Sequence, residues 1–457
     1  MENTFTLVAK TLPGFEEILA EELKALGAEN INILYRAVSF EADKALMYKA
    51  NYCLRTALRI LKPIQTFVAR NELMLYKKIF EIKWHEIFGI EETFAIDAVV
   101  SGNYFTHSQY AALKVKDAIA DEFRNKYGAR PSVDTENPDL RINVHIDNEK
   151  VTLSFDSSGD SLHKRGYRKA VDKAPMNEVL AAGLIKLTGW NYDKNFVDCM
   201  CGSATIPIEA AMAAMNVPAG YFREKYGFMT WHDFDEKLWK EVRTVADEDI
   251  RDFDYEIIAS DHSAKAVQIA QSNIKGAHLS HDITLSQQDM FEMTPPEGPG
   301  ILLINPPYGE RLEEKDLVNL YKNIGNALKH NFKGYEAWVI SSSYDCFDQI
   351  GLKASARIAL FNGDLDCEFR KYELFQGKYK GFRDEGNNLK KDFSPLKRKS
   401  RLTGLDGEQK GARRQPVDSD APDSEASVRR RRELESYFKT RTAQRVKSGR
   451  NERENKD

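Results

Sequence analysis

The 457-residue chain has few cysteines and no long apolar run, and these shortages narrow the classes of protein to which it can belong. No apolar stretch reaches the roughly 20 residues that a membrane-spanning helix needs, so we expect no membrane insertion. Five cysteines at irregular spacing do not make the framework of a disulfide-rich secreted domain. The first residues lack a basic region followed by an apolar block, so no secretory signal is predicted. We therefore expect a cytoplasmic protein.

Two common ligand motifs are also missing. The sequence contains neither Gly-x-Gly-x-x-Gly nor the Gly-Lys-Ser/Thr phosphate loop, so a nucleoside triphosphate is not predicted. Cys199 and Cys201 form a C-x-C pair, but no second pair or histidine cluster completes a zinc site. We predict no metal ligands.

Charge is distributed unevenly along the chain. Residues 386–457 contain 20 Lys and Arg against 12 Asp and Glu, a net charge of +8, whereas residues 1–385 contain 46 against 58, a net charge of −12. The basic segment has too few apolar residues to offset chain entropy, so we predict a disordered tail. Such a tail can attract nucleic-acid phosphates or only aid solubility, and its charge leaves both interpretations open.

The N-terminal third mixes strand and helix patterns without a visible catalytic constellation. Apolar residues recur at helical spacing over residues 15–27 and 107–128, and a third helix is predicted over 45–60. Residues 141–156 alternate apolar and polar residues on both sides of Asp-Asn-Glu-Lys, which predicts a hairpin. This region is interpreted as a binding or positioning module.

The pattern changes after residue 190. Five apolar segments end in polar residues, and helical segments of about a dozen residues separate them, which predicts βαβ units and a parallel, Rossmann-like sheet. In an open sheet of this kind, the ligand binds beyond the carboxyl ends of the strands. The segments are 195–216, 255–277, 283–293, 300–312 and 336–347.

Three of these strand ends carry residues suited to a nucleoside. Gly202 permits a tight turn before a helix, whose free N–H groups favour an electron-rich ligand. The Asp261 carboxylate can accept hydrogen bonds from both hydroxyls of a ribose, although an aspartate is equally suited to cap the N-terminus of a helix. Asp289 can accept from an adenine amine while Met290 covers the ring. Taken singly, each residue is also compatible with a structural role.

The fourth end, Asn305-Pro306-Pro307-Tyr308, is the most informative. The lone pair of an exocyclic amine is delocalised into its base, so the planar amine is a poor nucleophile. The Asn305 side-chain oxygen and the Pro306 carbonyl can each accept one amine hydrogen, which favours a pyramidal nitrogen. Prolines fix φ and donate no N–H, so the loop stays rigid and presents acceptors. Tyr308 offers a flat face for an extruded base.

These strand ends together indicate S-adenosylmethionine (SAM) held against a nucleobase. The sequence resembles the class I SAM-dependent RNA methyltransferases with a THUMP domain, in particular the bacterial guanine-N2 methyltransferases of large-subunit (23S) rRNA. The resemblance rests on PGFEEILAEEL, LHKRGYRKA, DCMCGSAT, NPPYGERL and FNGDLDCEFRKYELFQG. It implies an N-terminal mixed α/β region with a ferredoxin-like segment at 1–44 packed on an RNA-binding THUMP domain at 45–155. A methyltransferase domain at 156–385 and the tail at 386–457 would follow.

The resemblance also implies roles for individual residues. Asp198, Gly202 and Ser203 would line the methionine side of the cofactor, Asp261 would hold the ribose, and Asp289 with Met290 would hold the adenine. Asn305, Pro306, Pro307 and Tyr308 would receive the base, and Lys169, Ala174 and Pro175 belong to a segment that closes over the cofactor. The chain departs from the family at Cys199 and Ala204, where Pro and Gly are usual. The extra methyl at Ala204 would narrow the turn if that position needs a positive φ.

Other functions stay open at this stage. The tetrapeptide is similar to that of DNA methyltransferases acting on adenine N6 or cytosine N4, but no helix-turn-helix signature accompanies it. A tRNA guanine-N2 methyltransferase and a non-catalytic RNA-binding assembly factor are further alternatives, because fold alone does not prove activity. The sequence does not predict the oligomeric state.

Overall fold

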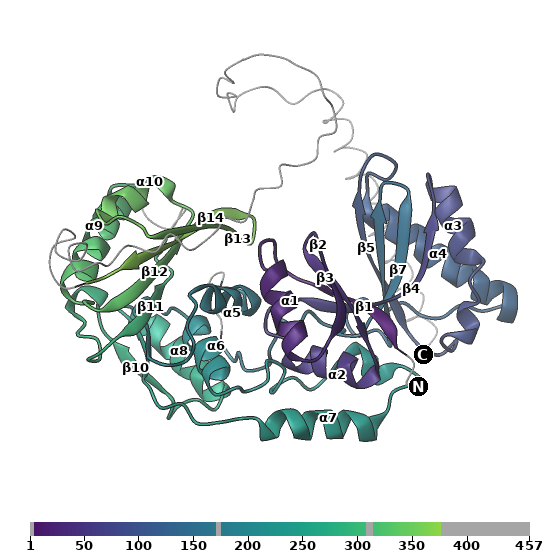
Figure 1. Cartoon of the computed structure of the whole chain (residues 1–457). Coiled ribbons are helices and arrows are strands. Elements are labelled where there is room, and N and C mark those ends of the chain that lie inside the picture. The colour runs from purple at the N-terminus through teal and green to yellow at the C-terminus, as the bar shows by residue number, and fades with distance from the viewer. Residues whose placement is uncertain (1–3, 171–174, 308–313, 376–457) are drawn as a thin grey trace, which may run out of the picture. The chain divides into compact units, whose positions relative to one another are not determined.

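The computed structural model describes residues 4–170, 175–307 and 314–375, which contain two seven-stranded sheets (Figure 1). The predicted tail, 386–457, lies outside the described residues. The α/β class is confirmed, with a mixed region first and a Rossmann-like domain second.

The first sheet has the strand order β2-β3-β1-β4-β7-β6-β5. All its pairings are antiparallel except that of β5 with β6. The predicted hairpin at 141–156 is confirmed as β6 and β7. Its elements are β1 (Phe5–Lys10), α1 (Glu16–Ala25), β2 (Glu29–Leu34), β3 (Ala37–Ala42), α2 (Lys44–Cys53), β4 (Arg59–Val68), α3 (Glu72–Phe80), β5 (Phe94–Ser101), α4 (Ser108–Tyr127), β6 (Leu140–Asp147) and β7 (Lys150–Asp156).

The helix predicted over 45–60 is too long. Helix α2 ends at Cys53, and Leu54 already has an extended backbone with ψ 127°. Arg59 and Ile60 instead begin β4 and pair with β1. A short apolar run fits a helix or a strand equally well, and here the ladder with β1 decides the outcome.

The second sheet has the order β10-β9-β8-β11-β12-β14-β13. Strands β8 to β12 are mutually parallel, and β14 runs antiparallel to its two neighbours. Its elements are α5 (Glu178–Leu187), β8 (Asn195–Asp198), α6 (Thr205–Ala214), α7 (Glu236–Glu248), β9 (Ile257–Asp261), α8 (Ala264–Gly276), β10 (Ile283–Gln287), β11 (Gly300–Ile304), α9 (Glu314–His330), β12 (Tyr335–Ser341), α10 (Tyr344–Phe347), β13 (Ala356–Asn362) and β14 (Leu365–Glu373). The chain order reverses between β8 and β11, which is the position where such sheets bind ligands.

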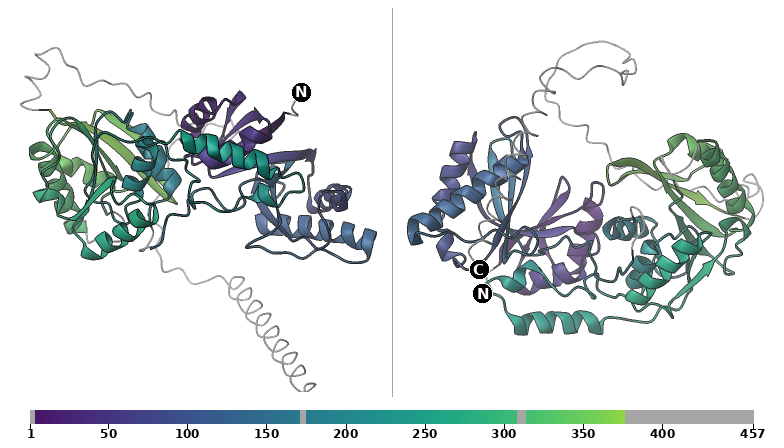
Figure 2. Two further views of the ribbon diagram at one scale, coloured as in Figure 1. Left: turned by 90° about the horizontal axis from the view of Figure 1, so that it is seen from below. Right: turned by 180° about the vertical axis from the view of Figure 1, so that it is seen from behind.

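Helices cover both faces of this sheet (Figures 1 and 2). Strand β11 is buried along its whole length. Its residues Ile301 and Leu303 pack in the core that contains α5, α6 and α8, whereas Leu302 and Ile304 pack in the core that contains α9 and α10. Burial on both faces explains why the strand is continuously apolar. The first polar side chain after it, Asn305, therefore falls at the carboxyl edge.

The N-terminal region contacts the second domain through both apolar and polar groups. Phe15 packs in the core of the second sheet, against Gly183 of α5, where a Cβ added to the glycine would lie 2.1 Å from the Phe15 ring. The Arg55 guanidinium donates to the carbonyls of Met212 and Val217, at 3.0 and 2.7 Å. These contacts fix α1 and α2 against α5 and α6.

Candidate active site

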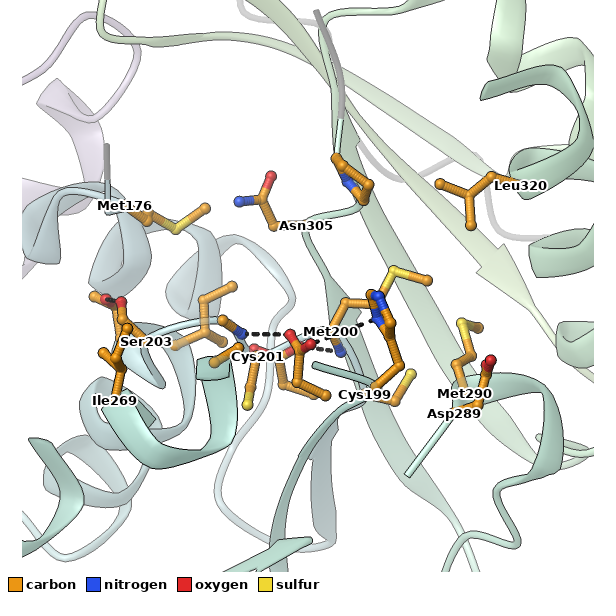
Figure 3. A pocket seen from close by; sticks show the side chains of 18 of the residues that line it. Met176, Cys199, Met200, Cys201, Ser203, Ile269, Asp289, Met290, Asn305 and Leu320 are labelled. Carbon is orange, nitrogen blue, oxygen red and sulfur yellow. Dashed lines mark hydrogen bonds and ion pairs between the residues drawn. The ribbon is translucent and has the colours of Figure 1, made fainter. Parts of the chain in front are cut away.

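A cavity of about 640 Å³ opens at the carboxyl ends of the parallel strands (Figure 3). Residues at the ends of β8 and β9 and in the segments after β10 and β11 line it, so the structure gathers most of the predicted site in one place. The predicted residues that line the cavity are Pro175, Asp198, Gly202, Ser203, Asp261, Asp289, Met290, Asn305 and Pro307. Lys169 and Pro306 are described but are not part of its lining, and Ala174 and Tyr308 lie outside the described residues.

The turn after β8 has a left-handed backbone at two positions. Gly202 has φ +53° and Ala204, which precedes α6, has φ +62°. Glycine adopts this region freely, but the Cβ of an L-residue costs about 1–2 kcal/mol there. The positive φ that would make Ala204 costly is therefore present, and the Ala204 methyl group is buried in the turn.

Asp261 joins two turns at the cavity wall. One carboxylate oxygen accepts from the Gly202 N–H at 3.0 Å, and the other accepts from the Ser263 N–H at 2.9 Å. The N-cap of α8 is Ser263, whose side chain accepts from Ala266, so Asp261 does not occupy the N-cap position. Its carboxylate fixes the glycine turn and still lines the cavity, with acceptor capacity left for a hydroxyl.

Asp198 has an unusual environment for a carboxylate. One oxygen accepts from the Met200 N–H at 3.1 Å, while the other is buried and has no partner among the described residues. Burial raises the pKa of Asp198 to about 8, and the negative charge of Asp261 acts in the same direction. A cationic ligand group would satisfy the free oxygen and favour the ionised form.

Asp289 and Met290 form the wall after β10. The Asp289 carboxylate caps a short 3₁₀ turn (Met290–Glu292) by accepting from the Phe291 N–H at 3.0 Å. The Met290 side chain is buried and packs in the core that contains α9. Both residues line the cavity, and Figure 3 shows them on the opposite side of it from Ser203.

Asn305 follows β11 and lines the same cavity as Asp261. Its Oδ1 atom is buried and has no hydrogen-bond partner among the described residues. A buried acceptor without a partner costs roughly 1–3 kcal/mol, so it signals a ligand group that completes it. An amine hydrogen is the kind of donor that this oxygen lacks.

Two residues that the sequence did not predict as part of the site hold the turn after β8 in place. Asn273 of α8 is fully buried, its amide oxygen accepts from the N–H groups of Lys169 and Ala170, and its amide nitrogen donates to the Ser203 carbonyl at 3.1 Å. Arg168 donates to the hydroxyls of Ser203 and Thr205, at 3.2 and 3.0 Å. The backbone N–H of Lys169 bonds to Asn273, and this bond holds the Lys169 segment beside the turn. The available signals were a polar residue on the buried face of a helix and the basic motif LHKRGYRKA.

Two absences hold for the described part of the chain. No group of three or more His, Cys, Asp or Glu side chains there could bind a metal ion. No helix in the same ranges is long and apolar enough to cross a membrane.

The strand order, the glycine turn and the acceptors at the strand ends define a class I methyltransferase domain. Comparison with known families agrees. Residues 6–61 match the RlmL ferredoxin-like domain, residues 69–156 match the THUMP domain, and residues 165–371 match the RMKL-like methyltransferase domain. The predicted boundaries at residues 44, 155 and 385 stay predictions.

Known proteins resemble the chain over most of its length. The provisionally named RNA methyltransferase slr0064 of Synechocystis sp. is 39% identical over 384 residues, which cover 82% of this chain and 100% of the relative. The structure of SMU.472, provisionally named a methyltransferase and complexed with SAH, has a TM-score of 0.74 at 29% identity and covers 83% of this chain and 100% of that one. A predicted N6-adenine-specific DNA methylase from Listeria monocytogenes has a TM-score of 0.73 at 30% identity, covering 81% and 97%.

The chain therefore belongs to the family of THUMP-containing, RMKL-like methyltransferases. It is a SAM-dependent enzyme of the class that methylates nucleic acids, and SAM is its cofactor. The residues fit this cofactor, because the buried free oxygen of Asp198 and the carboxylates of Asp261 and Asp289 supply acceptors around one cavity.

Proposed function

We propose that the protein methylates the exocyclic N2 amine of a guanine in large-subunit 23S rRNA. The observation that carries the proposal is the buried Asn305 Oδ1, which lacks a partner in the cavity that also contains the cofactor residues. An acceptor at this position suits a nucleophile that carries hydrogens on nitrogen. The guanine and rRNA assignment rests on the resemblance of the motifs and domains.

The residues of this chain would act by orienting the amine. Bound SAM would supply a methyl group on a positively charged sulfur, a leaving group that can retain the bonding electrons. Asn305 Oδ1 and the Pro306 carbonyl accept the two amine hydrogens and direct the nitrogen lone pair. Pro306 and Pro307 donate no N–H, so the segment offers only acceptors. Once the nitrogen carries the methyl group and a positive charge, its proton is acidic enough to pass to solvent without a strong base.

Asp198, Asp261 and Asp289 would hold the cofactor. The free oxygen of Asp198 would receive a cationic group, Asp261 would accept from the ribose, and Asp289 would accept from the adenine amine. One part of the cavity would therefore bind the cofactor, and the part beside Asn305 would bind the target base.

RNA is the proposed macromolecular partner. The THUMP domain and the name of the Synechocystis relative support RNA, and a mixed α/β module ahead of the catalytic domain suits recognition of folded RNA by shape. The basic segment 386–457 would add salt-sensitive attraction to phosphates. The Listeria relative supplies the second candidate, adenine N6 in DNA, because its name describes that activity.

The two candidates predict different modified nucleosides. We expect a deletion strain to lose N2-methylguanosine from 23S rRNA, measured by mass spectrometry of digested 23S rRNA, tRNA and genomic DNA. Expression of the intact gene should restore the nucleoside, and expression of Asn305→Ala should not. Loss of N6-methyladenine from DNA, or of a modified nucleoside from tRNA alone, would contradict the rRNA proposal.

A further inference from the structure

Helix α9 lines the cavity with polar side chains that the packing of the helix does not require. Leu317, Tyr321 and Ile324 form its buried face and pack in the core beneath β11. Three polar side chains on another face, with Leu320 among them, line the cavity that contains Asn305. The polar residues are Asp316, Asn319 and Asn323, spaced by three and four residues, so they lie on one side of the helix.

These polar groups are available to a ligand. Asp316, Asn319 and Asn323 are exposed, and no hydrogen bond or ion pair joins them to any residue whose side chain the structure describes. Helix packing does not require amides or a carboxylate here. Because the three side chains line a cavity, their donors and acceptors face the space that the substrate must enter.

The chemistry of this face favours a base over a phosphate. It contains one carboxylate, two neutral amides and the apolar Leu320, and no lysine or arginine. A carboxylate repels a phosphate, and no cation offsets that repulsion here, whereas carboxylates and amides both read base edges. Figure 3 shows Leu320 extending from α9 toward the cavity, where an apolar side chain can contact the flat face of a base.

We propose that this α9 face, made of Asp316, Asn319, Leu320 and Asn323, recognises the target base and selects guanine over adenine. The proposal rests on the proposed function and adds the residues that choose the base. Guanine carries an N1–H donor beside its N2 amine, and an ionised carboxylate only accepts hydrogen bonds. Asp316 accepts a hydrogen bond from the guanine N1–H, and Asn305 accepts one from the N2 amine. The N1 atom of adenine is unprotonated and is itself an acceptor, so a carboxylate repels it and cannot form a hydrogen bond with it.

The first experiment separates base recognition from cofactor binding. The full chain and its variants would be assayed on 23S rRNA from the deletion strain, with SAM affinity measured by calorimetry. Asp316→Ala, Asn319→Ala and Asn323→Ala should lower kcat/KM for this RNA and leave the SAM dissociation constant within about twofold. Asn326→Ala is the matched control, because Asn326 is exposed on the same helix but does not line the cavity. Weaker SAM binding in the α9 variants, or an equal loss in Asn326→Ala, would overturn the proposal.

The second experiment tests the hydrogen bond to N1. It uses a synthetic RNA fragment that spans the mapped target, with either guanine or 2-aminopurine, which keeps the amine but lacks N1–H. Wild-type enzyme should prefer guanine by roughly 10- to 100-fold, the range expected for one specific base contact. Asp316→Ala should lose most of this preference by slowing only the guanine reaction.

The outcomes distinguish the two proposals. If wild-type enzyme forms no N2-methylguanosine, the proposed function fails and the α9 assignment falls with it. If wild-type enzyme methylates guanine and Asp316→Ala keeps the full preference over 2-aminopurine, only the α9 assignment is wrong.

Discussion

The two seven-stranded sheets differ in strand direction, and the difference determines where chemistry can be assembled. In the first sheet, almost every neighbour is antiparallel, so successive strand ends lie at opposite edges. Polar groups there pair with one another, as in the Arg59–Asp156 ion pair and the bond from the Thr93 N–H to Asp139 at 2.8 Å. In the second sheet, parallel strands bring Asp198, Asp261 and Asn305 to one edge.

The two sheets therefore carry two kinds of residue. Side chains at the parallel edge should change cofactor binding or methyl transfer, whereas the N-terminal sheet should affect how the substrate is held. The free oxygens of Asp198 and Asn305 mark the edge as a place built for ligands. Substitutions can break or sharpen this division, and we expect the largest effect at Asn305.

Asn305→Ala should lower the rate of methyl transfer by roughly 10²–10³-fold, the loss typical for one preorganised polar contact in a transition state. SAM affinity should change less than twofold, because Asn305 faces the base. Single-turnover kinetics and calorimetry measure the two quantities. A parallel loss of SAM affinity would show that Asn305 belongs to the cofactor part of the cavity.

Asp261→Ala should weaken SAM binding by roughly 10- to 100-fold, as expected when a charged hydrogen-bond partner is removed. Asp261→Asn is the informative control, because its amide oxygen can still accept from the Gly202 N–H that fixes the turn. Asn at this position loses the bond from the Ser263 N–H but keeps the bond that fixes the glycine turn, so it should reduce affinity with that turn in place. Unchanged SAM affinity in both variants would contradict the assigned role.

Asp198→Asn should change how stability depends on pH. The folded pKa of about 8 lies above the ordinary value of 3.8, so the folded state holds a proton that the unfolded state releases. The resulting stability is fully present below about pH 4 and is lost as the pH rises toward 8, by about 1.4 kcal/mol per pH unit. The asparagine side chain does not titrate, so Asp198→Asn should lack this pH dependence.

Denaturant unfolding at pH 5, 7 and 9, without cofactor, checks this prediction. Relative to wild type, Asp198→Asn should gain stability between pH 5 and pH 9. A constant difference across the three pH values would mean that the folded pKa of Asp198 is not raised.

Ala204→Gly should stabilise the protein by about 1 kcal/mol, because glycine removes the cost of a Cβ at φ +62°. Ala210→Gly is the matched control in the interior of α6, where glycine should destabilise by about 1 kcal/mol. Thermal unfolding should shift the midpoints in opposite directions. A lower midpoint for both variants would argue against strain at Ala204.

Deleting residues 386–457 should have the smallest effect. RNA affinity should fall mainly at low salt, because the removed segment carries a net charge of +8. Filter binding of 23S rRNA across a salt series measures the slope. An unchanged slope would leave the tail with a role in solubility only.

The parallel sheet explains how much of the site the sequence could predict. Asp198, Asp261 and Asn305 each follow an apolar segment, and parallel strands place such residues together, so sequence order predicts their meeting. The roles of Arg168 and Asn273 depend on which turn each reaches in three dimensions, so local pattern does not reveal them.

Other misses had different physical causes. The end of α2 was misplaced because the residues after Cys53 suit a helix as well as a strand, and pairing with β1 decided between them. The polar face of α9 is indistinguishable in sequence from the solvent face of any amphipathic helix. Only the cavity beside Asn305 separates Asp316 and Asn319 from ordinary surface residues.

The most direct test is a crystal structure of the enzyme with SAH and an RNA fragment that contains the mapped target. The account predicts a guanine turned out of its strand, with N2 within hydrogen-bond distance of Asn305 Oδ1 and directed at the cofactor sulfur. An adenine amine at this position, or a guanine bound with Asn305 directed away from it, would contradict the account.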